Sequence, residues 1–565
     1  MIKRKKDKSM TFIKKHKTLT AHLIVLLVGI FFSLWLLKPG IINGHDMTFH
    51  LSRIKGLRDS IAVSDFRALI HVGLYGYGYA NGLFYGNLLL YVPALVSLMG
   101  VNLINSYKVY VLFCTLLSAF TMYWSAKSIT KSYKIGIFAS FLYSACSYKC
   151  CDFIIRAAVG EIGSFIFIPI IILGLYELVY RDYKKWYLFS IGFVGLVQCH
   201  LISTVLAAIL MAIFIIACYE RLLSDKKRIL YLIISAIVGL ALGAYFILPL
   251  LQGITKNNMV VNLNSFPIWK MTVPMEKLFL GFPYYKSDPF IPAGIGMIFI
   301  VISVLRFKIK PSSDDKLMKF CDLSLIFAYV CLLCATDFFP WKEITFLQSV
   351  QFPWRLYLFS SLFFTFSCSI IVFYYLKGKK RIDKVKFLIP IIVVAIIPYL
   401  VTENYYRAHS NGGIFYNWDD YTVASGEYLP INTDLKKLKK RGEKVTSNNK
   451  NLKVDYQKRG NRVDVTYEEN QDSDTYIEVP LLYYYGYSAR DNNNKEYKIT
   501  KGKNNVIRVY LPNEKGEFSV YYRGTTIQKY SVILSIIAWL FLCLYIVQDK
   551  RNKVVSRCLY EKRKN

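Results

Sequence analysis

Residues 19–37 read LTAHLIVLLVGIFFSLWLL, and residues 44–53, a few positions later, read GHDMTFHLSR. The first stretch is apolar and long enough to cross a bilayer as a helix. A basic tail, residues 1–18, precedes it, and Lys/Arg-rich flanks stay on the cytoplasmic side of a membrane. The second stretch is therefore expected at the outer face, where ionisable side chains are costly and typically functional.

The composition is that of a membrane protein. Of the 565 residues, 54% are hydrophobic and 19% are charged, and the mean hydropathy is +0.33. A net charge of +34 would suggest nucleic-acid binding in a soluble protein. Here the basic residues concentrate in both tails and in short loops, which is typical of the positive-inside pattern and of attraction to anionic lipid. We therefore expect membrane lipid as a partner and no nucleic acid.

The apolar runs predict about twelve membrane-spanning helices. Both tails are basic, so both termini are expected in the cytoplasm and the number of spans is expected to be even. Residues 88–104 are expected to form an interfacial or partial segment, while two further segments before residue 150 cross. The other runs after residues 19–37 are 161–180, 186–201, 203–219, 229–250, 291–306, 319–337, 354–376, 386–402 and 529–547.

A long segment near the C-terminus differs in kind from the apolar runs. Residues 403–527 alternate short strand-like runs with polar turns, and none of the twelve cysteines lies there. The predicted fold class is therefore an all-α polytopic membrane bundle with a small extracellular β-sandwich domain. The expected divisions are 1–18 (cytoplasmic tail), 19–402 (transmembrane domain, with outer-face loops 38–87 and 252–290), 403–527 (β-rich domain), 528–548 (last transmembrane helix) and 549–565 (basic cytoplasmic tail).

Asp46 is the leading candidate for chemistry. His45, His50 and Arg53 crowd the same turn, and positions 46, 50 and 53 share one face if the segment is helical. A carboxylate there can act as a general base, or can orient an acceptor hydroxyl or a metal. The alternative is an N-cap for the helix expected over 47–61, a common role for Asp.

Three other polar sites are expected at the same outer face. Arg156 and Glu161 precede an apolar run and offer a second carboxylate with a cation, or a helix cap. His200 ends a span and is either functional or a satisfied core histidine. Trp354 and Arg355 open another span, where the guanidinium can bind a phosphate bidentately or simply anchor the helix end.

Motifs for nucleotide binding and for soluble hydrolases are absent from the sequence. There is no GxxxxGK[ST], no GxSxG and no HExxH, and the expected cytoplasmic segments are too short to bind a nucleotide. An activated donor must therefore arrive in the membrane.

These features resemble the bacterial GT-C-type multipass membrane glycosyltransferases, in particular the YfhO-like group, also described as 6-pyruvoyl-tetrahydropterin-synthase-related membrane proteins. The resemblance covers nearly the whole chain and rests on the order of several short motifs. These are 44–50 after the first span, Arg156 with Gly160-Glu161, Gln351-Phe352-Pro353-Trp354-Arg355, Gly426-Glu427-Tyr428-Leu429-Pro430 and Val479-Pro480-Leu481-Leu482-Tyr483-Tyr484. This chain is shorter than the YfhO-like proteins and has one modest external domain.

The resemblance implies a polyprenyl-phosphate sugar as donor, a catalytic Asp in the first external loop, and a GT-C-like fold. Asp46 and Glu161 would then be catalytic, and His45, His50, Arg53, Arg156, His200, Trp354 and Arg355 would bind substrate or phosphate. Some members of this class need a divalent metal and others do not; the ligand candidates here are Asp46, His50 and Glu161.

Three functions remain open from the sequence. The first is sugar transfer from a lipid-linked donor to a cell-envelope glycan acceptor at the outer face. The second is a flippase or transporter of lipid-linked glycan, although internal repeats and midplane charges typical of transporters are not evident. The third is a non-catalytic envelope assembly factor whose β-rich domain binds partners.

Overall fold

The computed structural model describes residues 2–262, 267–279, 294–312, 315–409, 413–468, 470 and 474–564. The chain divides into two compact units. The first unit comprises Met1–Met47, Lys108–Gly239 and Ser265–Asn417; the second comprises Thr48–Tyr107, Leu240–Asn264 and Trp418–Asn565. The expected combination of an apolar helical part with a β-rich part near the C-terminus is confirmed.

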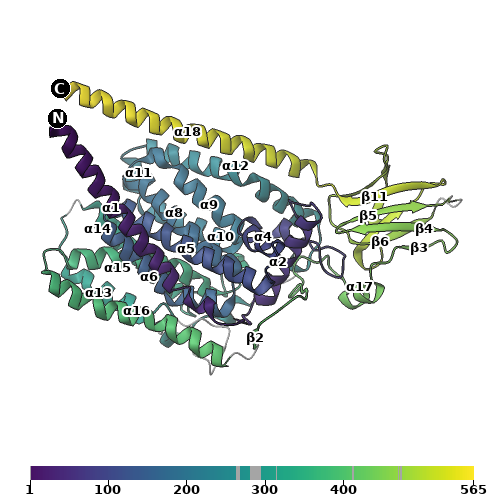
Figure 1. Cartoon of the computed structure of the whole chain (residues 1–565), viewed down its shortest axis with the longest axis horizontal. Helices are drawn as coiled ribbons and strands as arrows, with labels where there is room; N and C mark the ends of the chain where they lie inside the picture. Colours follow the sequence, from purple (N-terminus) through teal and green to yellow (C-terminus); the bar gives the residue numbers. More distant parts are fainter. Residues whose placement is uncertain are drawn as a thin grey trace. The chain divides into compact units, whose positions relative to one another are not determined.

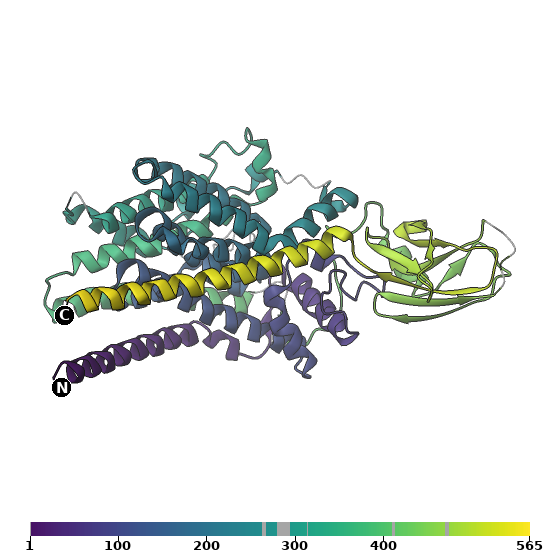
Figure 2. The same cartoon turned by 90° about the horizontal axis from the view of Figure 1, so that it is seen from above.

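Seven helices in the described part of the chain are long and apolar enough to cross a membrane. Figure 2 shows α18, in yellow, as one unbroken helix that ends at the C-terminus. The seven spans are Leu103–Thr130 (α5), Val159–Tyr180 (α8), Lys227–Lys256 (α12), Lys316–Cys334 (α14), Pro353–Tyr375 (η10, Pro353–Leu356, with α15, Tyr357–Tyr375), Arg381–Asn404 (within α16, Arg381–His409) and Thr526–Val555 (within α18, Thr526–Lys564).

The expected count of about twelve spans is not confirmed, because several apolar runs fold into shorter helices. Helix α1 (Ile2–Phe31) stops six residues before the end of the run 19–37, and the remainder forms the 3₁₀ turn η1 (Leu34–Leu37). Helices α6 (Tyr133–Ala145), α9 (Tyr187–Cys199), α10 (Leu201–Ala217) and α13 (Met297–Val304) have 17 residues or fewer and are too short to be among the seven. Residues 291–293 of the run 291–306 lie outside the described residues.

Helices α8 and α15 form the core of the first unit. The apolar window of α8 is 89% buried and that of the α15 span is 94% buried, so both are surrounded mainly by protein. Gly174 of α8 approaches α9 so closely that a Cβ would lie 2.3 Å from the Phe189 amide nitrogen. Small residues permit such close helix pairs in membranes. Figure 1 shows α13, α14 and α15 beside one another, and α15 packs against both of the others.

Short elements join these helices and carry most of the polar residues. Strands β1 (Ile41–Ile42) and β2 (Ile414–Phe415) pair antiparallel within the first unit. After α6 come α7 (Ser147–Cys150) and a π-helical turn, η3 (Cys151–Arg156). The remaining elements are η4 (Tyr183–Lys185), α11 (Tyr219–Leu223), η6 (Ile268–Met271), η7 (Met275–Lys277), η8 (Leu305–Lys308) and η9 (Thr345–Val350).

The second unit contains a β-sandwich, visible in Figure 1 as two layers of strands. Alternating apolar residues in strands such as β5, whose inward positions are Val463, Val465 and Tyr467, build its core. One sheet has the order β3-β6-β10-β9 and the other β4-β5-β11-β7-β8, and all neighbours are antiparallel. The strands are β3 (Thr446–Ser447), β4 (Val454–Arg459), β5 (Arg462–Tyr467), β6 (Tyr476–Leu482), β7 (Tyr487–Arg490), β8 (Glu496–Tyr497), β9 (Ile499–Lys501), β10 (Val506–Tyr510) and β11 (Gly516–Tyr522).

The strands of the sandwich, from Thr446 to Tyr522, occupy fewer residues than the predicted domain 403–527. Helix α16 continues to His409, and β2 pairs with β1 of the first unit. The predicted loop 38–87 contains helices, and parts of the predicted loop 252–290 (263–266 and 280–290) lie outside the described residues. Besides α18, the start of α5 and the end of α12, the second unit contains α2 (Met47–Ala62, whose first residue belongs to the first unit), α3 (Asn81–Phe84), η2 (Leu88–Leu90), α4 (Tyr91–Leu98), η5 (Val260–Asn262), α17 (Leu435–Arg441) and η11 (Lys503–Asn505).

Candidate active site

Two distant motifs meet in the first unit. The Asp46 amide donates to the Arg156 carbonyl (2.9 Å), and the His45 amide donates to that of Ile155 (3.3 Å). Gly44 makes this approach possible, because a Cβ there would lie 2.5 Å from the Ile155 carbonyl oxygen. The π-helical turn η3 ends at Arg156, and Ala157 follows in the left-handed region (φ 52°). π-Helical turns of this kind frequently occur at functional sites.

Arg156 is the centre of a buried network. Its Nη1 donates to Asp152 Oδ1 (2.5 Å) and to the Tyr148 hydroxyl (3.1 Å), and its Nη2 donates to Glu161 Oε1 (3.1 Å). The Tyr148 hydroxyl also donates to Glu161 Oε2. Arg156 is 4% exposed, Glu161 1% and Asp152 0%. Buried charges are tolerated when they are paired, and each carboxylate here is paired with Arg156, although Asp152 Oδ2 has no hydrogen-bond partner among the described residues.

Arg355 reaches Glu161 from the start of the α15 span. Its Nε donates to Glu161 Oε1 (3.2 Å), and its Nη1 donates to the carbonyl of Val350 (2.6 Å) and to Gln351 Oε1 (2.9 Å). The guanidinium lies 4.9 Å from the centre of the Phe352 ring. Glu161 therefore holds two arginines that lie 199 residues apart in the sequence.

The charged groups of this network interact electrostatically with Asp46. Burial raises the pKa of Asp46, while the positive charges of Arg156 and Arg355 act in the opposite direction and the negative charge of Glu161 adds to the rise. The side chain is half-buried, whereas Glu161 is fully buried. A carboxylate with a raised pKa is a stronger base than an ordinary Asp.

His200 and Trp354 are buried in the same unit. His200 caps α10, where its Nδ1 accepts from the Ser203 amide (3.3 Å) and lies 2.8 Å from the Ser203 hydroxyl. Its positive form would interact with Glu161. Trp354 stacks on Phe352 with ring centres 4.6 Å apart. The indole Nε1 of Trp354 is buried and has no hydrogen-bond partner among the described residues.

The predicted residues His50 and Arg53 belong to the second unit, while His45 is an exposed residue of the first. Arg53 is 1% exposed, and its guanidinium lies 3.8 Å from the centre of the Tyr85 ring. Arg53 Nη2 donates to the Gly86 carbonyl (2.9 Å), and Nη1 lies 3.4 Å from His50 Nδ1. Much of the hydrogen-bonding capacity of Arg53 is thus used inside the second unit.

Glu161, one of the candidate metal ligands, is already fully hydrogen-bonded. Its Oε1 accepts from Arg156 and Arg355, and its Oε2 accepts from Tyr148. Among the described residues, no group of three or more His, Cys, Asp or Glu side chains could hold a metal ion.

Sequence reasoning missed Tyr148, Asp152 and Gln351. Asp152 stands four residues before Arg156 in an otherwise apolar run, and an ionisable residue in such a run was the available signal. Tyr148 gave no comparable signal, because the chain contains 44 tyrosines and nothing in its local sequence distinguishes this one. Gln351 became relevant only through its contact with Arg355.

Comparisons with known proteins do not assign the chain to a family. No family model matches it. An uncharacterized protein of Lactococcus lactis subsp. cremoris (strain MG1363) is 22% identical over 606 aligned positions, which cover 93% of this chain and 94% of that protein.

Two solved structures show weak likeness. The arabinofuranosyltransferase AftD from Mycobacteria has a TM-score of 0.38 and 12% identity, over 67% of this chain and 26% of AftD. The oligosaccharyltransferase of Archaeoglobus fulgidus has a TM-score of 0.38 and 12% identity, over 72% of this chain and 57% of that chain. The chain thus spans about a quarter to about half of their lengths, and likenesses of this size do not assign a fold or a function.

Proposed function

We propose that the protein is a membrane glycosyltransferase that transfers a sugar from a polyprenyl-phosphate carrier to a hydroxyl of a cell-envelope glycan at the outer face. The observation that carries this proposal is the buried cluster in which Glu161 binds Arg156 and Arg355, and in which the Asp46 amide donates to the Arg156 carbonyl. Sugar transfer needs a base for the acceptor hydroxyl and positive charge for the leaving phosphate. The cluster offers both a carboxylate and positive charge. The described part of the same chain contains seven helices that are long and apolar enough to cross a membrane.

Asp46 is the proposed base. Its carboxylate takes the proton of the acceptor hydroxyl as that oxygen forms a bond to the anomeric carbon of the sugar. The bond between the anomeric carbon and the phosphate oxygen breaks, and the electron pair leaves with the polyprenyl phosphate. The proton on Asp46 then passes to water or to the departing phosphate, which regenerates the carboxylate.

Arg355 is the proposed phosphate ligand, and Glu161 is proposed to position it. The hydrogen bonds that Arg355 makes to described residues use its Nε and Nη1, which leaves Nη2 for a ligand oxygen. Glu161 fixes the orientation of Arg355 and of Arg156 at once. Because the arginines are fixed before the substrate arrives, they stabilise developing charge without reorganisation.

A deletion strain tests the proposal. Mass spectrometry of wall glycans and lipid-linked sugars should show loss of one sugar and accumulation of its polyprenyl-phosphate form. The wild-type gene should reverse both changes, and Asp46→Asn, made in equal amount, should reverse neither. Full complementation by Asp46→Asn would contradict the enzyme and favour an assembly factor. For a transporter, the carrier-linked sugar would accumulate on the inner leaflet, where added external glycosidase cannot reach it.

A further inference from the structure

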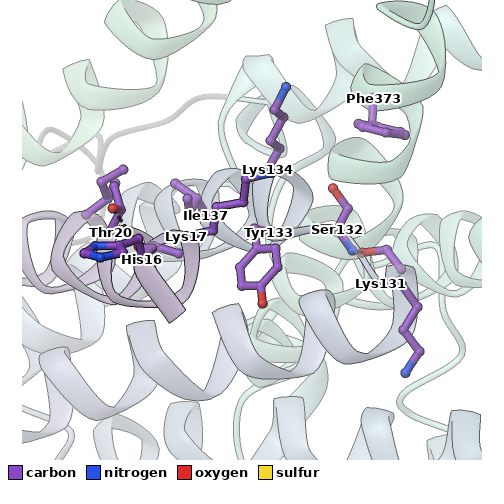
Figure 3. A pocket seen from close by; sticks show the side chains of 12 residues that line it. His16, Lys17, Thr20, Lys131, Ser132, Tyr133, Lys134, Ile137 and Phe373 are labelled. Carbon is purple, nitrogen blue, oxygen red and sulfur yellow. Dashed lines mark hydrogen bonds between the residues drawn. The ribbon is translucent and has the colours of Figure 1, made fainter. Parts of the chain in front are cut away.

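A groove in the first unit has none of the candidate active-site residues in its lining. It has a volume of about 1010 Å³ and is bordered by α1, the α5–α6 turn and the end of α15. Figure 3 shows His16 and Thr20 on one side and Ser132 with Phe373 on the other. The positive-inside pattern places the α5–α6 turn, which carries Lys127, Lys131 and Lys134, on the cytoplasmic face.

The rim of the groove is basic. His16 and Lys17 come from α1, and Lys131 and Lys134 leave the α5–α6 turn in opposite directions (Figure 3). No Asp or Glu is among its lining residues, all of which lie in the described part of the chain. The rim therefore complements an anionic group.

Part of the lining of the groove is apolar. Ile24 and Phe373 belong to this part and are each 38% exposed. On α1, the exposed apolar side chains of Leu23 (52%) and Leu27 (63%) continue away from the basic end. A soluble anion would use only the basic rim, whereas an amphiphile with an acyl chain would use the rim and the apolar lining together.

We propose that this groove binds an anionic phospholipid of the cytoplasmic leaflet, with the phosphate at Lys17 and Lys134 and an acyl chain along Ile24 and Phe373. Basic pockets between membrane helices on the cytoplasmic side bind anionic head groups by the same combination of forces. The proposal is independent of sugar transfer, because none of its residues belongs to the Asp46 cluster.

Native mass spectrometry of the purified full chain tests the site. Titration with phosphatidylglycerol should give a saturable adduct that phosphatidylcholine does not match. The double variant Lys17→Gln with Lys134→Gln should weaken phosphatidylglycerol binding about 25-fold, because the loss of each lysine should weaken it about fivefold. The matched control is Lys226→Gln with Lys227→Gln, two exposed lysines of another basic loop, which should change the affinity by less than about twofold.

Two further measurements separate the outcomes. Phe373→Ala should weaken the binding by about fivefold through lost apolar contact, and this exposed side chain can be removed without a cavity in the core. If the lysine variants fail to fold, the Phe373→Ala variant alone still tests the proposal. Equal losses in both lysine pairs, unchanged binding in Phe373→Ala, or displacement of the lipid by an equal concentration of inorganic phosphate would each overturn the proposal.

Discussion

Asp46 and Glu161 are two carboxylates beside the same arginines, but their surroundings differ. Glu161 accepts hydrogen bonds from Arg156, Arg355 and Tyr148 and is closed off from solvent. Asp46 is half-buried and has a raised pKa. A carboxylate whose oxygens are occupied by cations is a poor base, so proton transfer is proposed for Asp46 and positioning for Glu161.

The first prediction concerns Asp46→Asn. Removal of the base should lower the rate of sugar transfer by about 10²–10⁴-fold, whereas a pure capping role would leave it nearly intact because Asn caps about as well as Asp. The measurement is transfer in membranes that contain equal amounts of each protein. The control is Asp182→Asn, because Asp182 caps η4 through the Lys184 amide (3.2 Å) and should tolerate the change. If Asp46→Asn changes the rate of sugar transfer by twofold or less, Asp46 acts as a helix cap and not as the base.

The second prediction concerns pH. Because Asp46 has a raised pKa, the acid limb of kcat/KM should lie above the value of about 3.9 for an ordinary Asp, with activity rising as Asp46 ionises. The raised pKa also stabilises the folded state. This contribution is fully present at pH values below the unfolded-state pKa, and it is lost as the pH rises through the folded-state pKa of Asp46. Asp46→Asn removes this loss, so its Tm at pH 7 should equal or exceed that of the wild type. A clearly lower Tm would contradict the raised pKa.

Helix α8 carries a matched pair of buried glutamates. Glu161 in its first turn binds Arg156 and Arg355, and Glu177 near its other end binds Arg181 (3.4 Å) and Lys185 (3.0 Å). They are 1% and 2% exposed and lie about 24 Å apart along the helix axis. The two positions are therefore alike in burial and pairing and differ in their distance from Asp46.

The third prediction uses this pair. Glu161→Gln should lower sugar transfer at least about tenfold, because Arg355 and Arg156 lose their shared anion and the phosphate contact loses its orientation. Glu177→Gln should leave transfer within about twofold when activity is normalised to folded protein. Equal losses in both variants would indicate that Glu161 serves stability alone.

The fourth prediction concerns the contact between residues 44–46 and the π-helical turn η3. Gly44→Ala should shift this contact, because the new methyl group would meet the Ile155 carbonyl at 2.5 Å, and overpacking of this kind costs about 1–3 kcal/mol. Activity should fall along with Tm. The control is Gly239→Ala, where the nearest atom to a Cβ is 3.6 Å away. An unchanged Gly44→Ala enzyme would show that Asp46 does not depend on this contact.

At the scale of the whole molecule, the fifth prediction is the topology. Both tails are expected in the cytoplasm and the β-sandwich outside. In a background with Cys543 and Cys558 replaced by Ser, an impermeant thiol reagent added to intact cells should label Lys450→Cys and not Lys553→Cys. Lys450 is an exposed residue between β3 and β4, so the change should not disturb the sandwich. Labelling of Lys553→Cys in intact cells would reverse the orientation.

Features that depend on local pattern can be read from the amino-acid sequence. Apolar length and composition identify membrane helices, and alternation with polar turns identifies strands, because both are properties of consecutive residues. Hydropathy alone overcounted the spans, since it does not register where a helix ends inside an apolar run, as α1 does at Phe31 within the run 19–37. Asp46, Arg156, Glu161 and Arg355 were recognisable as costly ionisable groups near apolar runs.

The hydrogen-bond and ion-pair partners of these groups follow from the packing of the folded chain. The docking of residues 44–46 on η3 and the approach of Arg355 to Glu161 join segments that are remote in sequence. The helical spacing of Asp46 and Arg53 predicted that these two residues share one face. In the structure the Arg53 guanidinium stacks on the Tyr85 ring and donates to the Gly86 carbonyl. Partner choice depends on which segments pack together and on which hydrogen bonds burial then requires, and neither is encoded in the local spacing of residues.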